Sequence, residues 1–435
     1  MSIKEGMNRR RFLKNSAVGV LGASALSGSN LLGEEEKPKQ TEFKIKDYRT
    51  LGRTGFKVSD ISTGYVNNAA VLNQLLDAGI NYIDTAESYG NEPVVGKVTK
   101  ERDRKKVFIT TKIEVKKDLS KEGFLKRARK CLENLHTDYI DCMMMHGPTN
   151  VKTIKTEGFH AAMKQLKTEG KVRFVGISNH GSNWPDKDAQ SMEQVLSAAA
   201  MDGRFDVMLL AYNFLQQDNG KKVLEICKDK NIGTTLMKVN PVGQYYAIKE
   251  YIEKTEKEGK KAPERFKNFL PALKAKADKA DFFAKKYNLK NPAAIRDAAI
   301  RFCLDNSNVH TVCCAFRNFD DLEKYIKLSG TRLNAGDKQK LAAYTEACGE
   351  LYCRHACGLC QSQCPNNVPI NTIMRYNHYY DAHGREKYAM KKYAQIDTPK
   401  ADLCAACPGA CQTACPYGVP IHGLLNLAHR NLSLV

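Results

Sequence analysis

The sequence of 435 residues lacks several features that would place it in a large protein class. No apolar run approaches the ~20 residues that a helix needs to cross a bilayer, which excludes a multi-span membrane protein. With 42% hydrophobic and 27% charged residues, the composition is neither collagen-like nor that of a disordered chain. The length exceeds that of a usual single domain, so we expect one large domain with an appendage.

Acidic residues are too few to balance the basic ones. The 68 Lys and Arg residues outnumber the 48 Asp and Glu residues, which gives a formal net charge of +20. No recognised nucleic-acid-binding motif accompanies this charge, so we favour a solvated basic surface over a nucleic-acid partner. Such a surface could also help to dock a redox partner protein.

Residues 1–42 resemble a twin-arginine export signal followed by a linker. The segment Asn8–Lys14 reads NRRRFLK, and a mildly apolar stretch, Ala17–Leu26, follows it with small residues where a signal peptidase could cut. The charged segment Gly33–Gln40 reads as a flexible linker. We therefore expect a periplasmic or otherwise exported protein; the alternative is a basic amphipathic N-terminus without an export role.

From about Phe43 the pattern opens with a predicted hairpin, Tyr48–Val58, and then alternates short apolar runs with amphipathic stretches. Eight such runs separated by helical patterns predict an α/β fold, a (β/α)₈ TIM barrel. A doubly wound sheet is the main rival, but the first strand-to-helix turn, TGYVN at 63–67, lacks the Gly-x-Gly-x-x-Gly fingerprint of that fold. The Lys- and Glu-rich stretch Gln244–Lys276 is expected to form an enlarged loop and helix over the barrel mouth. The predicted strands are Ile61–Gly64, Asn81–Asp84, Val107–Thr111, Tyr139–Met144, Val172–Ile177, Val207–Leu210, Ile232–Met237 and Val309–Cys313.

Polar side chains collect at the carboxyl ends of three predicted strands, which face one mouth of a barrel. Asp84 and Tyr89 follow one strand, Lys112 ends the next, and His146 ends a third. Each has a structural reading alone, since an Asp-Thr pair often caps a helix and a single His after a strand is usually packed. Together they suit carbonyl reduction, which needs a proton for the oxygen as hydride reaches the carbon.

The four side chains have distinct expected roles in that chemistry. Tyr89 would donate the proton, and the Lys112 ammonium would lower its pKa from the usual value of ~10. Asp84 would hold Lys112 and balance its charge. His146 would orient the carbonyl and support the developing negative charge.

These residues resemble the Asp-Tyr-Lys-His tetrad of the aldo/keto reductase family, and the resemblance spans roughly Tyr48 to Tyr325. It implies a barrel domain over residues 43–345, a carbonyl or alcohol substrate and a nicotinamide dinucleotide, NADP(H) or NAD(H). By position, Ser178 and Asn179 are implied to bind the nicotinamide carboxamide. Arg317 and Asn318 fall where the family binds the cofactor phosphates, and a guanidinium suits that contact.

The chain departs from the family pattern at cofactor positions. Leu209 stands where the family usually has a Gln that contacts nicotinamide, and Met237 and Lys238 replace the usual stacking Tyr and following Ser. The nicotinamide form, and whether one is used, therefore stay open.

Residues 346–435 carry two cysteine runs, which form the strongest local signal in the chain. Four thiolates per run suit one [4Fe-4S] cluster each, and each run ends in Cys-Pro, although each differs by one residue from the bacterial ferredoxin spacing. Disulfides and zinc are the alternatives. The runs resemble dicluster ferredoxin modules, which implies a small, mostly helical, ferredoxin-like iron–sulfur domain. The predicted ligands are Cys353, Cys357, Cys360, Cys364, Cys404, Cys407, Cys411 and Cys415.

The two halves together predict an exported oxidoreductase that interconverts an alcohol and a carbonyl compound, that is, an aldehyde or ketone, which includes sugar-derived ones. Electrons would pass through the tail to or from a redox partner. A second hypothesis is an iron–sulfur electron-transfer subunit whose barrel is a docking scaffold, which the intact tetrad argues against. A third, a non-redox sugar-binding module, fits the barrel but not the cysteine runs.

Overall fold

The computed structural model describes residues 43–116, 118–181, 188–242, 245, 248–250, 253, 270–289, 291–381, 384–397 and 399–433. The predicted export signal and linker (1–42) and most of the predicted loop Gln244–Lys276 lie outside these residues. Among the described helices, none is long and apolar enough to cross a membrane.

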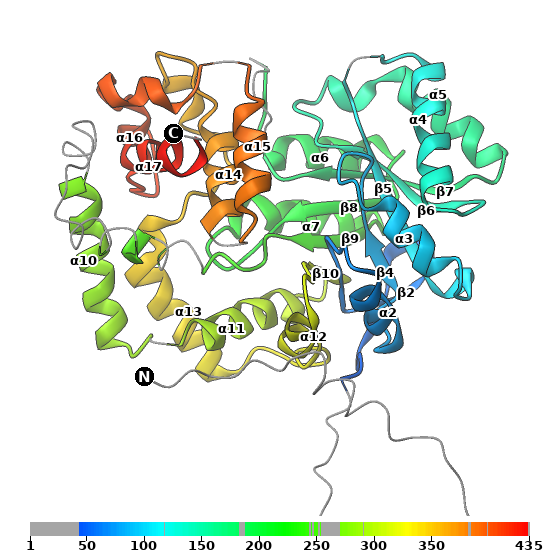
Figure 1. Ribbon diagram of the computed structural model, residues 1–435, viewed down its shortest axis with the longest axis horizontal. Helices are drawn as coiled ribbons and strands as arrows, with labels where there is room; N and C mark the ends of the chain where they lie inside the picture. Colours follow the sequence, from blue (N-terminus) through cyan, green and yellow to red (C-terminus); the bar gives the residue numbers. More distant parts are fainter. Residues whose placement is uncertain are drawn as a thin grey trace, which may run out of the picture.

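A closed barrel of eight parallel strands forms the larger part of the molecule (Figure 1). Each predicted strand is present, and the last one, β10, pairs with both β3 and β9 and so closes the cylinder. The (β/α)₈ prediction is thus confirmed, and the doubly wound alternative is wrong because an open sheet would leave two strand edges unpaired. The strands are β3 (Ile61–Thr63), β4 (Tyr82–Asp84), β5 (Phe108–Glu114), β6 (Ile140–His146), β7 (Val172–Asn179), β8 (Val207–Ala211), β9 (Gly233–Met237) and β10 (Thr311–Cys314).

Helices surround the barrel. Local signals start several of them: the Asn68 side chain accepts backbone N–H bonds at the start of α2, and Ser191 forms a capping box with Gln194 at the start of α6. The helices of this layer are α2 (Ala69–Asp77), α3 (Glu92–Thr99), α4 (Lys121–Asn134), α5 (Glu157–Thr168), α6 (Met192–Asp202), α7 (Asp218–Asp229), α11 (Pro292–Asp305) and α12 (Phe319–Ile326), with short 3₁₀ turns η2 (Arg104–Lys106) and η3 (Thr153–Lys155).

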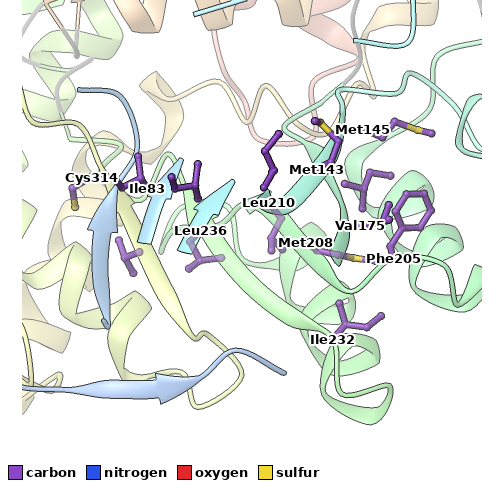
Figure 2. Packing of buried hydrophobic residues seen from close by; sticks show 14 of the residues in the cluster. Ile83, Met143, Met145, Val175, Phe205, Met208, Leu210, Ile232, Leu236 and Cys314 are labelled. Carbon is purple, nitrogen blue, oxygen red and sulfur yellow. The ribbon is translucent and has the colours of Figure 1, made fainter. Parts of the chain in front are cut away.

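The apolar residues of the barrel form two layers because successive side chains of a strand point to opposite sides. In β6, Met143 and Met145 pack outward in the layer between strands and helices, which Figure 2 shows from close by. Cys142 and Met144 point into the cylinder, where they join Tyr82, Phe108 and Leu209.

The predicted hairpin closes the opposite end of the barrel. β1 (Tyr48–Thr50) pairs antiparallel with β2 (Lys57–Ser59), with η1 (Gly52–Thr54) between them. Leu51 and Val58 belong to the inner core. Gly52 has a φ of +47°, and a Cβ there would lie 2.3 Å from the backbone nitrogen of Gly233, so glycine is required where the turn meets β9.

The remaining chain is helical, as predicted for the tail; its residues from Thr372 to Lys392 line the barrel mouth, whereas α13 (Ala335–Cys348) packs on α10 (Leu270–Lys286) and α11 (Figure 1). A second hydrophobic core joins tail residues such as Ile373 and Leu424 to Leu273, Ala298 and Leu341 of helices that precede the tail. The predicted boundary at 345/346 stays a prediction, although this core runs across it. The other elements are η4 (Gly349–Leu351), η5 (Gln361–Gln363), α14 (Ile370–Asp381), α15 (Glu386–Ala394), η6 (Ala401–Ala406), α16 (Ala410–Thr413) and α17 (Ile421–Leu432).

Candidate active site

The structure brings the four predicted catalytic residues together at the barrel mouth. The Lys112 ammonium is fully buried and donates to Asp84 Oδ2 at 2.6 Å and to the Thr85 carbonyl oxygen at 2.8 Å. Its Nζ also lies 3.5 Å from the hydroxyl oxygen of Tyr89. The Tyr89 ring meets the His146 ring edge-on, with 5.8 Å between centroids. One phenol thus lies between an ammonium and an imidazole.

The protonation states of this cluster differ in one respect from the sequence prediction. The pKa of Tyr89 is raised well above 10, first by burial and then by the Asp84 carboxylate, whereas the sequence predicts that Lys112 lowers it. Burial has the largest effect, and Asp84, which pairs with the Lys112 ammonium, adds to it. Tyr89 is therefore a protonated phenol at neutral pH, the form that donates a proton.

His146 is neutral. Burial lowers its pKa well below 6.5, and the nearby Lys112 charge lowers it further. Its Nδ1 is buried without a partner among the described residues. A neutral imidazole can donate one hydrogen bond to a carbonyl oxygen without competing as an acid.

The two residues predicted to bind the nicotinamide carboxamide differ in how available their side chains are. Both Ser178 and Asn179 are buried at the end of β7. The Asn179 amide already donates to the Pro148 carbonyl oxygen at 2.7 Å and accepts from the Gly181 N–H at 2.8 Å. The Ser178 hydroxyl is buried without a partner in the part of the chain that is described, so it is an available polar contact.

Two arginines lie on the side of the mouth where the predicted phosphate contacts lie, beside Lys238, whose pKa burial lowers well below its usual value. Arg317, Lys238 and Arg385 line a small cavity of about 100 Å³. The Arg317 guanidinium reaches Asp321 at 3.7 Å. Asn318 caps α12 by accepting from the Asp321 N–H, which makes it a structural residue in the described contacts. The donor set fits anionic phosphates, although the cavity is smaller than the ~300 Å³ typical for a whole cofactor-sized ligand.

Tail residues cover the mouth, a placement that the sequence analysis did not predict. Lys238 Nζ donates to the Tyr379 hydroxyl at 3.0 Å, and the Arg385 guanidinium lies 4.6 Å from the Tyr65 ring centroid and 3.9 Å from that of Tyr388. The one signal in the sequence was the basic and aromatic content of the segment after Ile370, which does not by itself indicate the surface it packs on.

Thiols of the two cysteine runs lie near one another in the tail. Burial and the neighbouring thiols Cys360, Cys357 and Cys415 raise the pKa of Cys353 well above its usual value. The Arg354 guanidinium lies 4.2 Å from the centroid of the Tyr417 ring, which places the end of the second run beside the start of the first.

Thiols of the second run likewise lie near Cys364 of the first run. The pKa of Cys411 is raised to about 11 by burial and by Cys364 and Cys407, and that of Cys404 to about 12 by burial and by Cys411, Cys364 and Cys407. Helix α16 of the second run contacts η5 of the first.

All fifteen cysteines are free thiols in the structure. Among the described residues, no three His, Cys, Asp or Glu side chains converge as they would around a single metal ion. Thiolates that hold a cubane bind different iron atoms, so they surround the cluster rather than meet at one point. Cys415 of the second run lies near thiols of the first run, and Cys364 of the first run lies near thiols of the second.

Comparison with known proteins agrees with the barrel. The model of a protein family described as "Aldo/keto reductase family" matches residues 50–346, which is more than half of the chain. A solved structure of an aldo-keto reductase of Bacillus halodurans in its holo form is similar to this chain with a TM-score of 0.50 at 20% identity, and covers 68% of this chain and 96% of that one. This likeness shows the fold.

Two curated relatives illustrate the range of similarity. The methylglyoxal reductase DkgB of Salmonella typhimurium is 30% identical over 37% of this chain and 57% of its own length. The aldo-keto reductase YhdN of Bacillus subtilis is 24% identical over 69% of this chain and 94% of its own. The chain spans only 39% to 57% of the first methylglyoxal reductases that it matches.

Proposed function

The chain belongs to the aldo/keto reductase family, and from that premise we propose that it is an oxidoreductase that interconverts a small aldehyde or ketone and the corresponding alcohol. The observation that carries the proposal is the buried contact of Lys112 with Asp84 and Tyr89 beside His146. Similarity to methylglyoxal reductases supports a small carbonyl substrate.

The chain's own residues account for the proton side of the reaction. His146 donates a hydrogen bond that orients the carbonyl, and Tyr89 delivers its proton to the oxygen as negative charge develops there. Lys112 then lies 3.5 Å from the oxygen of the phenolate that forms, and its ammonium stabilises that charge. Asp84 holds the ammonium in place.

A nicotinamide dinucleotide would supply the hydride when bound. Arg317, Lys238 and Arg385 would hold its phosphates, and the Ser178 hydroxyl, which has no partner among the described residues, would hold its carboxamide. NADP(H) is the form consistent with the family.

Replacing Tyr89 with Phe tests the proposed activity. Because the substitution removes only the proton-donating hydroxyl, carbonyl reduction should fall by ~10²–10⁴-fold while the fold is retained. Anaerobic steady-state assays with methylglyoxal and NADPH measure the change, and far-UV circular dichroism checks the fold. Turnover unchanged in the Phe variant would exclude Tyr89 as the acid and favour the barrel as a scaffold.

We also propose that the tail holds two [4Fe-4S] clusters that exchange electrons with a redox partner. The thiol groups support one cluster on Cys353, Cys357, Cys360 and Cys415 and the other on Cys364, Cys404, Cys407 and Cys411. Iron and acid-labile sulfide analysis of anaerobically purified protein tests this, with about eight of each per chain expected. Zinc or no metal in that preparation would exclude the clusters.

Export by the twin-arginine route is the corresponding proposal for residues 1–42. Replacement of Arg9 and Arg10 together by Lys should leave the protein in the cytoplasmic fraction, whereas the unaltered chain should reach the periplasmic fraction.

A further inference from the structure

A second cavity lies directly beside the catalytic cluster, and both the barrel and the tail build it. It has a volume of about 120 Å³. The barrel contributes Tyr89, His146 and His180 from its strand ends, and α14 and α15 contribute the opposite wall. The tail residues of that wall are Thr372, Arg375, Tyr376, Tyr379, Tyr388 and Lys392.

The charges around this cavity do not balance. Its lining includes the cations Lys116, Arg375 and Lys392 and a single carboxylate, Glu114. Glu114 already pairs with Lys116 at 3.3 Å. No carboxylate of the described residues pairs with Lys392, so the tail side of the cavity carries surplus positive charge.

Arg375 is held in place rather than lying loose on the surface. Its side chain is only 2% exposed, and its Nη1 lies 2.8 Å from His180 Nδ1. His180 adds no charge of its own, because burial and then the Arg375 charge lower its pKa well below 6.5. A buried guanidinium that lines a small cavity holds a fixed positive charge there, which favours an anionic ligand.

We propose that this cavity binds the anionic group of the substrate, so that the preferred substrate is a carbonyl compound that carries a carboxylate or phosphate. Arg375 and Lys392 hold the anion while the carbonyl lies at Tyr89 and His146. That the bound anion is part of the substrate rests on the proposed carbonyl reduction. Binding of an anion in the cavity does not itself require turnover. The tail thereby contributes directly to specificity.

Equilibrium binding of unreactive probes tests anion binding in the cavity separately from carbonyl reduction. Isothermal titration of the anaerobically purified full-length protein with butanoate, propyl phosphate and butanamide compares two anions with a neutral molecule close in size to butanoate. At least one anion should bind tenfold or more tightly than butanamide, and which one binds better distinguishes a carboxylate from a phosphate site.

Neighbouring lysines on α15 provide a matched pair of variants. Lys392→Met should weaken anion binding about tenfold, as expected for loss of one charge-assisted contact. Lys391→Met removes an equal charge from the exposed side of the same helix and should change nothing. Arg375→Lys keeps the charge but loses the paired donors, and should weaken binding with iron content unchanged.

Equal binding of the anions and butanamide, or a Lys392→Met protein that binds like the unaltered one, overturns the proposal. Tyr89→Phe should keep anion binding although it loses turnover. Anion binding without any carbonyl reduction by the unaltered protein would leave the anion site standing and refute the proposed function, so the two failures are distinguishable.

Discussion

Lys112 and Asp84 form an ion pair that is almost fully removed from water at the barrel mouth. Their side chains are 1% and 5% exposed, and Asp84 Oδ1 has no hydrogen-bond partner among the described residues. Burial raises the pKa of Asp84 although Lys112 opposes the shift. Such a pair costs desolvation energy, so the charges are retained here for their position beside Tyr89 rather than for stability.

Breaking this pair from one side should destabilise the protein more than removing it whole. Lys112→Met leaves the Asp84 carboxylate buried without its cation, at an expected cost of about 3 kcal/mol in the free energy of unfolding. The double variant Lys112→Met with Asp84→Asn should recover part of that loss. Urea denaturation of the single and double variants measures the coupling. Additive losses would contradict a direct pairing.

The grouping of the four candidate residues could be predicted from the sequence because they stand near or just after the carboxyl ends of strands, and the end of a parallel strand fixes which mouth its side chains face. The pKa of Tyr89 could not, because it depends first on how deeply the fold buries the phenol and then on the Asp84 carboxylate beside it. The sequence indicates that Asp84 and Lys112 are neighbours in the fold, but not how their charges offset each other at the hydroxyl oxygen of Tyr89.

At the scale of elements, the barrel strands were predictable and the placement of α14 and α15 was not. Each strand is a short apolar run whose period identifies it. By contrast, Arg375 and Tyr379 lie on a helix whose polar and aromatic pattern fits either solvent or a partner surface. Its packing on α15 and α17, the second hydrophobic core, and the contacts of Arg375 with His180 and of Tyr379 with Lys238 place that helix at the mouth.

Asp381, at the end of α14, makes that element sensitive to pH. Burial raises its pKa to about 7, although the Asn377 amide donates to it at 2.7 Å. Because the folded pKa exceeds the unfolded value of about 4, the folded state binds the proton more tightly. Stability from this group is therefore full below about pH 4 and is lost as pH rises through about 7.

Asp381→Asn should remove this dependence, because the amide resembles the protonated carboxyl. We expect the variant to be more stable than the unaltered protein by about 1–2 kcal/mol at pH 8, a value reduced from the full linkage energy because the carboxyl is partly exposed. At pH 4 the two should be equal. Thermal unfolding at both pH values measures the difference, and an equal gain at both would show that ionisation is not the cause.

Across the whole molecule, the tail and barrel depend on one another at the mouth. The mouth cavities draw Arg375, Lys392 and Arg385 from the tail and Tyr89 and Tyr65 from the barrel. The proposed clusters would fix the two cysteine runs that flank α14 and α15. Cluster occupancy should therefore affect substrate binding although the clusters do not line the cavity.

Losing one cluster ligand should thus weaken anion binding at a distance. Cys360→Ala should reduce iron from about eight to about four atoms per chain, loosen the tail and weaken butanoate or propyl phosphate binding at least as much as Lys392→Met does. The matched control is Cys348→Ala, since Cys348 is a buried thiol of α13 outside both runs; it should keep all the iron.

Limited proteolysis should cut the Cys360 variant in the tail first and leave the barrel intact, because the closed strand cylinder retains its own core. If the iron is lost while anion affinity and the cleavage pattern stay the same, the clusters do not hold the tail wall of the cavity, and α14 and α15 are positioned by the shared hydrophobic core alone.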